Sequence, residues 1–166
     1  MSQAADAFVG TQAPDFTLQD GQGRDWRLSD KRGRIVAFLF YPGNETLVCT
    51  KQLCSVRDHW SEYIATGAEI VGVSAGTVES HQKFAKHHNL PLTLLADTDG
   101  SVTKRYTGQW WMPSWITRAI VVVDAEGIVR HRRIMLGVFR PRDKWVVAAI
   151  YSANFDKLLT RYGGRR

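Results

Sequence analysis

The sequence predicts an α/β fold in which helices flank a central mixed β-sheet. Three apolar runs, at residues 35–41, 69–74 and 119–123, are continuous rather than alternating, as is typical of strands buried on both faces. Segments with helical spacing separate these runs, and alternation of strands with helices indicates a parallel core. The third run leads through a turn into residues 128–135, which predicts an antiparallel hairpin and makes the sheet mixed. We expect the three apolar strands to be parallel strands that lie side by side.

The remaining elements follow from turn and helix signals along the chain. Residues 13–18 alternate polar and apolar side chains, which predicts a short strand, and Pro42 and Gly43 end the first long strand. The helical pattern that follows is uninterrupted until Gly67, so we expect one helix over about 46–64. The other expected elements are helices at 77–88 and 101–106, a short strand at 91–96, and a last helix from Pro141 with an apolar stripe of Val146, Ala149, Ile150, Phe155 and Leu158.

Length and composition favour a single globular domain. The 166 residues suit one domain over 1–166, with a core at about 10–159 and a basic C-terminal tail at 162–166. No apolar run approaches the roughly 20 residues of a membrane span, and residues 1–8 show no secretory pattern. Two cysteines are too few for a disulfide scaffold or an unaided four-ligand zinc site. We therefore expect a cytoplasmic protein with a reactive thiol pair and no membrane association.

Cys49 lies where a buried strand gives way to a helix. The apolar run ends at Tyr41, and helical spacing begins at about Thr46, so Cys49 should occupy the first turn of the helix. Unpaired N–H groups and the partial positive charge of that turn favour a thiolate, which is the nucleophilic form. We therefore expect Cys49 to be the nucleophile. For Cys54, further along the helix, a buried structural role is about equally consistent with the pattern.

The stretch around Cys49 resembles the active-site segment of the peroxiredoxins. The family motif Pro-x-x-x-Thr-x-x-Cys is matched by Pro42, Thr46 and Cys49. Cys54 follows five positions after Cys49, which looks like the Q-type subfamily, also called bacterioferritin comigratory protein. Where that subfamily usually has Pro-Gly, this chain has Leu47-Val48. The resemblance extends over residues 10–159, and it implies a thioredoxin-like sandwich.

The resemblance also implies a function and a set of site residues. A family arginine precedes an apolar strand that ends in Asp, and Arg118, followed by residues 119–124, fits that pattern. The implied activity is reduction of hydrogen peroxide and organic hydroperoxides by a peroxidatic Cys49, assisted by Pro42, Thr46 and Arg118. In the Q-type pattern Cys54 resolves the oxidised Cys49 within the same chain. The implied partner is thioredoxin or another dithiol reductant, the protein is a monomer or homodimer, and no cofactor is required.

Two other functions remain open on the residues alone. A thiol–disulfide oxidoreductase or redox sensor would use Cys49 and Cys54 without reducing peroxide, although four intervening residues differ from the two of thioredoxin-type exchangers. A nucleic-acid-binding module would use residues 118–166, which hold 11 Lys/Arg and 4 Asp/Glu, a net charge of +7. No nucleic-acid motif accompanies that charge, so a solvated basic face is the favoured interpretation and nucleic acid an unlikely partner.

Histidines and tryptophans supply the other unusual patterns. Adjacent residues on a helix do not face the same way, so His87 and His88 do not suggest a metal site and we predict none. Trp110, Trp111 and Trp115 lie in one short segment beside Pro113. That segment could roof the site near the arginine, contact a partner or second subunit, or fill the core.

Overall fold

A seven-stranded mixed sheet is the centre of the described part of the protein, in the order β2-β1-β5-β4-β3-β6-β7. The computed structural model describes residues 7–108, 113 and 116–162, with side chains up to residue 155. Trp110, Trp111, Trp115 and the tail at 163–166 therefore lie outside the described residues. The elements are β1 (Thr17–Asp20), β2 (Asp25–Arg27), a 3₁₀ turn (Leu28–Lys31), β3 (Val36–Phe40), α1 (Leu47–Asp58), α2 (Trp60–Ala65), β4 (Glu69–Ser74), α3 (Val78–His88), β5 (Thr93–Ala96), α4 (Ser101–Thr107), β6 (Thr117–Val123), β7 (Val129–Leu136) and α5 (Asp143–Tyr162).

The three apolar strands lie side by side, as predicted. β3 pairs with β4 in parallel, and its other edge pairs with β6. However, β6 runs antiparallel to β3, so the interpretation of all three runs as parallel strands is wrong for β6. A continuous apolar run reports burial on both faces of a sheet, which strands of either direction can have inside a layered fold. The β6–β7 hairpin is antiparallel, as predicted.

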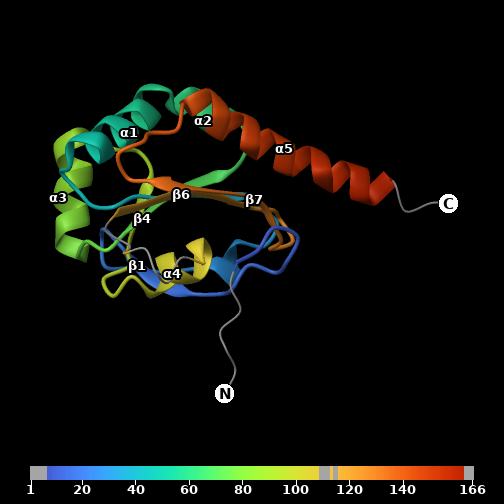
Figure 1. Cartoon of the computed structure of the whole chain (residues 1–166), viewed down its shortest axis with the longest axis horizontal. Coiled ribbons are helices and arrows are strands. Elements are labelled where there is room, and N and C mark those ends of the chain that lie inside the picture. Colours follow the sequence, from blue (N-terminus) through green and yellow to red (C-terminus); the bar gives the residue numbers. More distant parts are fainter. Residues whose placement is uncertain (1–6, 109–112, 114–115, 163–166) are drawn as a thin grey trace, which may run out of the picture.

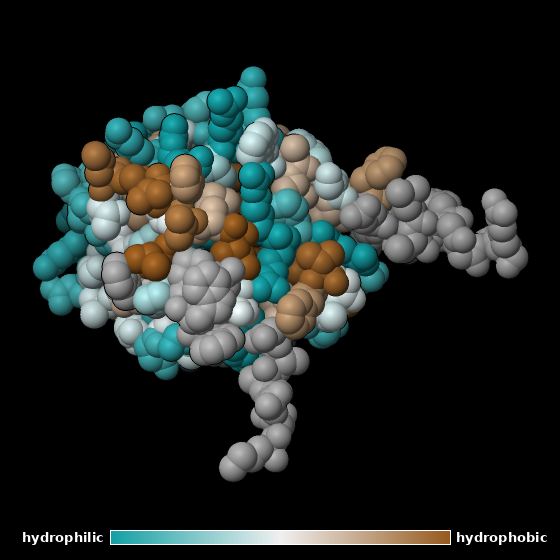
Figure 2. All heavy atoms as spheres, viewed as in Figure 1, coloured by the Kyte–Doolittle hydropathy of each residue, from teal (hydrophilic) through white to brown (hydrophobic). Residues whose placement is uncertain are grey.

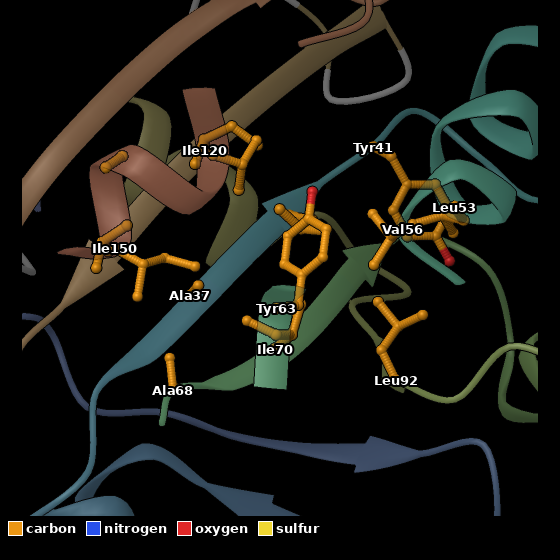
Figure 3. Packing of buried hydrophobic residues seen from close by; sticks show 14 of the residues in the cluster. Ala37, Tyr41, Leu53, Val56, Tyr63, Ala68, Ile70, Leu92, Ile120 and Ile150 are labelled. Atoms are coloured by element: carbon orange, nitrogen blue, oxygen red, sulfur yellow. The ribbon is translucent and has the colours of Figure 1, made fainter. Parts of the chain in front are cut away.

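Helices cover both faces of the sheet, and β3 divides two hydrophobic cores (Figure 1). Side chains of β3 alternate between the faces. Ala37 and Leu39 pack in the core under α1, α2, α3 and α5, whereas Phe38 and Phe40 pack in the core with β1, β2 and α4. Figure 3 shows the first of these cores, where helical residues such as Leu53 and Tyr63 meet the sheet. Cys49 belongs to the first of these cores and follows the end of β3 in the chain.

The helix predicted over 46–64 is two helices with a break at His59. The His59 backbone has left the helical region, with φ −107° and ψ 23°. Both helices contact the same carboxylate of α5: Tyr63 of α2 donates to Asp143 Oδ1 at 2.6 Å, and Ser55 of α1 donates to Asp143 Oδ2. The break lets both segments pack under the start of α5. No Gly or Pro marks it, so the sequence contained no local signal.

Helix α5 begins at Asp143 and extends beyond the sheet (Figure 1). Its side chains Val146, Ala149 and Ile150 are buried against the sheet, as predicted. Phe155 was predicted in the same stripe, but 60% of its surface is exposed. The prediction is wrong for Phe155 because the helix has by then passed the edge of the sheet. In the described residues no helix is long and apolar enough to cross a membrane.

Candidate active site

Cys49 occupies the first turn of α1, at the end of β3 where it was predicted. Thr46 is the N-cap, and its Oγ1 accepts a hydrogen bond from the Cys49 backbone N–H at 3.4 Å. This contact orders the loop between β3 and α1 and leaves the sulfur facing the sheet edge. Only 1% of the Cys49 surface is exposed. The N–H groups of the turn favour negative charge at this position.

Arg118, the second residue of β6, places its guanidinium against the sulfur. Its Nη2 donates to Cys49 Sγ at 3.1 Å and also to the carbonyl of Gly137 at 3.0 Å, and Nε donates to the same carbonyl at 3.3 Å. Arg118 is fully buried. A buried guanidinium needs partners for its N–H groups, and the Cys49 sulfur, the Gly137 carbonyl and the Gln52 amide oxygen supply them. The pairing of β3 with β6 brings Arg118 and Cys49 together.

Gln52 is a site residue that the sequence analysis missed. It lies three residues after Cys49 and therefore on the same side of α1. Its Oε1 accepts from Arg118 Nη1, and the side chain is only 3% exposed. The Gln52 amide nitrogen has no hydrogen-bond partner among the described residues. Gln52 holds the guanidinium fork in plane, and the three-residue spacing from a nucleophilic cysteine was the signal that could have identified it.

A pocket of about 410 Å³ opens beside Cys49. Its lining is mostly apolar and comes from the β3–α1 loop, the first turn of α1 and the two ends of the β6–β7 hairpin: Pro42, Thr46, Leu47, Val48, Cys49, Ile116, Leu136, Gly137 and Val138. A Cβ on Gly137 would lie 2.6 Å from Pro42 Cγ, so a side chain there would collide with the proline ring. Figure 2 shows hydrophobic side chains gathered over α1 and the connection from β7 to α5. The pocket therefore presents a mostly apolar surface next to Cys49.

Cys54 is not in contact with Cys49 in this structure. Both thiols are free, Cys54 is half-buried, and α1 is continuous from Leu47 to Asp58. In a regular helix, residues five apart have Cα atoms about 8.6 Å apart. A disulfide needs roughly 4.4–6.8 Å. A bond between the two sulfurs therefore requires local unwinding of α1.

A polar network supports the loop that precedes Cys49. The Tyr41 hydroxyl donates to Asn44 Oδ1 at 2.7 Å, and Asn44 Nδ2 lies 2.6 Å from Ser80 Oγ and 2.8 Å from His81 Nδ1. Burial raises the pKa of Tyr41 and lowers the pKa of His81, so both are neutral at pH 7. The loop is thus fixed to α3 by neutral hydrogen bonds.

A second link joins the loop to the other end of α3. His87 Nδ1 and His88 Nε2 each lie 3.1 Å from a carboxylate oxygen of Glu45. Hydrogen bonds from His88 and then His87 hold the pKa of Glu45 below its usual value. The sequence interpretation that the two histidines point apart is wrong, because Glu45 lies beside the end of the helix and both rings turn toward it.

Comparison with known proteins identifies the family. The AhpC/TSA family model matches residues 9–132. The chain belongs to the AhpC/TSA family. It is 36% identical to a protein named putative peroxiredoxin bcp from Coxiella burnetii, over 73% of this chain and 84% of that protein. It is 41% identical to a protein named Peroxiredoxin Q, chloroplastic, from Sedum lineare, over 73% of this chain and 66% of that protein. These relatives confirm the resemblance to the Q-type subfamily.

Two solved structures of AhpC/TSA relatives place the fold. Peroxidoxin BcpB from Mycobacterium tuberculosis superposes with a TM-score of 0.74 and 28% identity, over 88% of this chain and 97% of that one. A reduced 2-Cys peroxiredoxin from Plasmodium vivax superposes with a TM-score of 0.81 at 23% identity, over 95% of this chain and 86% of that one. Together they confirm the predicted thioredoxin-like sandwich. The chain spans 57–66% of the length of several plant relatives that it matches.

Proposed function

We propose that this protein is a thiol-dependent peroxidase that reduces hydroperoxides at Cys49. The observation that carries the proposal is the 3.1 Å contact between Arg118 Nη2 and Cys49 Sγ. It places a permanent positive charge on a sulfur at a helix N-terminus, at the base of a pocket that a small substrate can enter. Family membership supports the same activity.

The first chemical step is attack by the Cys49 thiolate on one oxygen of the hydroperoxide. A sulfur–oxygen bond forms as the oxygen–oxygen bond breaks, and the second oxygen leaves as water or an alcohol after taking up a proton. Cysteine is oxidised to sulfenic acid and the hydroperoxide is reduced. Negative charge spreads over the sulfur and both oxygens, and Arg118 stabilises it. The Thr46 hydroxyl faces the same pocket and donates to a peroxide oxygen, while Pro42 shields the sulfur from water.

In the second step the thiol of Cys54 attacks the sulfenic sulfur. Water leaves, and the Cys49–Cys54 disulfide forms. Because α1 is continuous between these residues, the segment must first unwind. A dithiol protein, thioredoxin or a similar reductant, then reduces the disulfide, and α1 refolds around the thiolate. Cys54 is half-buried near the surface of α1, which supports access by a reductant after unwinding.

The pocket favours organic hydroperoxides alongside hydrogen peroxide. Leu47 and Val138 stand at its rim with 72% and 71% of their surfaces exposed. Leu47 and Val48 replace the Pro-Gly of the resembled subfamily, so this chain presents a larger apolar side chain in place of proline and adds one where the subfamily has glycine. An alkyl or aryl group would bury against them, at about 25 cal/mol per Å² of apolar surface removed from water. The sulfur itself requires only the two peroxide oxygens, so hydrogen peroxide remains a substrate.

The proposal also covers the compartment, the domain organisation and the partners of the protein. We place the protein in the cytoplasm, where thioredoxin keeps thiols reduced, as a single domain over 1–166 that works as a monomer or homodimer. A nucleic-acid role is disfavoured because basic side chains of β7 have intramolecular partners. Arg132 donates to the carbonyl of Ala7 at 3.1 Å, and Arg133 lies over the Trp145 ring at 4.7 Å.

A steady-state assay tests the proposed function. Hydrogen peroxide, tert-butyl hydroperoxide and cumene hydroperoxide would each be consumed with thioredoxin, glutaredoxin or dithiothreitol as reductant. We expect consumption of all three substrates by the wild type and none above background by Cys49→Ser. A wild-type protein that exchanges disulfides with thioredoxin but leaves every hydroperoxide intact would instead be a thiol–disulfide oxidoreductase.

A further inference from the structure

A carboxylate and two imidazoles converge on the side of the active-site loop that faces α3. His87 Nδ1 lies 3.1 Å from Glu45 Oε1, and His88 Nε2 lies 3.1 Å from Glu45 Oε2. One potential ligand atom from each residue can be chosen so that all three lie within 4.8 Å of one another. Nothing in the proposed peroxidase reaction uses these side chains.

The cluster combines a fixed ligand with accessible ones. The His88 ring packs edge-on against Phe84, with ring centroids 5.0 Å apart, and its side chain is only 17% exposed. His87 and Glu45 are 70% and 51% exposed, so an ion can reach the ligand atoms from solvent. The two histidine rings have centroids 4.4 Å apart and an interplanar angle of 33°. One imidazole is therefore held in place by the core, and the other two ligands can adjust by rotamer changes.

We propose that Glu45, His87 and His88 form a binding site for a divalent transition-metal ion of the zinc class. Two imidazoles and one carboxylate are a common zinc ligand set, with a fourth position left for water. Zinc–ligand bonds of about 2.0–2.2 Å in a tetrahedron place ligand atoms about 3.3 Å apart. The His87 and His88 nitrogens each lie 3.1 Å from a different oxygen of Glu45, which is close to that spacing. Two nitrogen ligands select against Mg²⁺ and Ca²⁺, which prefer all-oxygen sites.

An ion in this site would fasten the active-site loop to α3. Glu45 directly precedes Thr46, whose Oγ1 caps the turn that holds Cys49. The same end of α3 also holds the far end of α1, because Arg57 Nη1 donates to the His88 carbonyl at 2.6 Å. If the proposed function is correct, α1 must unwind between these two attachments before the disulfide can form. Bound metal therefore slows disulfide closure while leaving the first oxidation of Cys49 unaffected.

Metal binding is tested by calorimetric titration of the full chain with ZnCl₂. The titration uses a Cys49→Ser/Cys54→Ser background, so that neither thiol competes for zinc and the result does not depend on peroxidase activity. We expect one equivalent of zinc to bind, with affinity reduced about tenfold or more by Glu45→Gln or His87→Gln. Both substituted side chains are exposed, and circular dichroism checks their folding. MgCl₂ and CaCl₂ should give no binding heat.

His59→Gln is the matched control for the titration. His59 Nδ1 also lies near a carboxylate, 3.5 Å from Asp143 Oδ2. This histidine–carboxylate pair has no second histidine to complete a zinc ligand set among the described residues. We expect zinc affinity unchanged in this variant. The proposal would be overturned if the background protein did not bind one equivalent of zinc. It would also be overturned if Glu45→Gln and His87→Gln bound zinc as tightly as the background protein does.

A stopped-flow measurement then tests the consequence for disulfide closure. In the protein with both cysteines, zinc should slow closure more than in His87→Gln, with the rate of the first oxidation unchanged in both. Zinc binding at these ligands in a protein without peroxidase activity would leave the metal site standing and overturn the proposed function alone. Equal slowing in both proteins would assign the effect to the thiols and overturn the link between this site and α1.

Discussion

Replacement of Arg118 by alanine is the sharpest test of how the site activates its sulfur. The change removes the donor that lies 3.1 Å from Cys49 Sγ. At an effective dielectric constant of about 20, unit charges at that separation attract by about 5 kcal/mol, which is an upper bound on the effect. A charge-assisted hydrogen bond contributes about 1.5–3 kcal/mol net, and loss of one donor to a developing anion costs about 100- to 1,000-fold in rate. We expect the rate constant for oxidation of Cys49 to fall about 100- to 1,000-fold.

The assay is single-turnover oxidation, followed by tryptophan fluorescence or by the loss of free thiol. Arg118→Lys keeps the charge but loses the fork that reaches Gln52, Gly137 and the sulfur together, so its rate should fall between wild type and Arg118→Ala. Arg133→Ala is the control, because it removes an arginine from β7 that packs on Trp145. If Arg118→Ala retained its fold by circular dichroism and oxidised Cys49 at the rate of the control, Arg118 would not be the group that activates the sulfur.

Three further changes follow from the same geometry. Cys54→Ser should still react once with hydroperoxide but fail to turn over with a dithiol reductase, and mass spectrometry should show more irreversible oxidation of Cys49; normal turnover would exclude Cys54 as the resolving residue. Gly137→Ala would bring a Cβ within 2.6 Å of Pro42 Cγ, so its free energy of unfolding in urea should fall by about 1–3 kcal/mol, whereas unchanged stability would contradict the close contact. Burial lowers the pKa of His81 in the folded protein, so below pH of about 6.5 the unfolded chain binds more protons than the folded one and the free energy of unfolding falls as pH decreases. In His81→Gln the free energy of unfolding should therefore fall less between pH 7 and 5. A decline identical to that of the wild type would assign the pH dependence to other groups.

Much of the fold could be predicted because apolar runs and turns are local signals. The strand at 69–74 was predicted with the observed bounds, and the three apolar strands lie side by side as predicted. The direction of β6 and the break at His59 depend on how distant segments pack. In the second case the deciding contacts come from Asp143, more than 80 residues away in the sequence. The hydrophobic pattern of a short segment does not report contacts with distant residues, so it could predict neither feature.

The site shows the same division between local and distant causes. The place of Cys49 in the first turn of α1 followed from the strand, the turn residues and the helical spacing around it. Arg118 was found only through resemblance, because β3–β6 pairing brings together residues far apart in the chain. Gln52 was missed although its spacing from Cys49 is local, since a glutamine on a helix is usually a surface residue. Glu45 lies 42 and 43 residues from the two histidines in the sequence, and the three side chains meet only through the packing of the loop on α3.

The peroxidatic role of Cys49 is tested most directly by the fate of the two thiols after one equivalent of hydroperoxide has been added. Reduced protein would be mixed with cumene hydroperoxide, and both the residual thiols and the intact mass would be determined within seconds. We expect loss of both thiols in the wild type, with a Cys49–Cys54 disulfide, and one added oxygen on Cys49 in Cys54→Ser. Two free thiols in wild-type protein that has retained its fold, with the hydroperoxide still intact, would contradict the assignment of Cys49 as a peroxidatic cysteine.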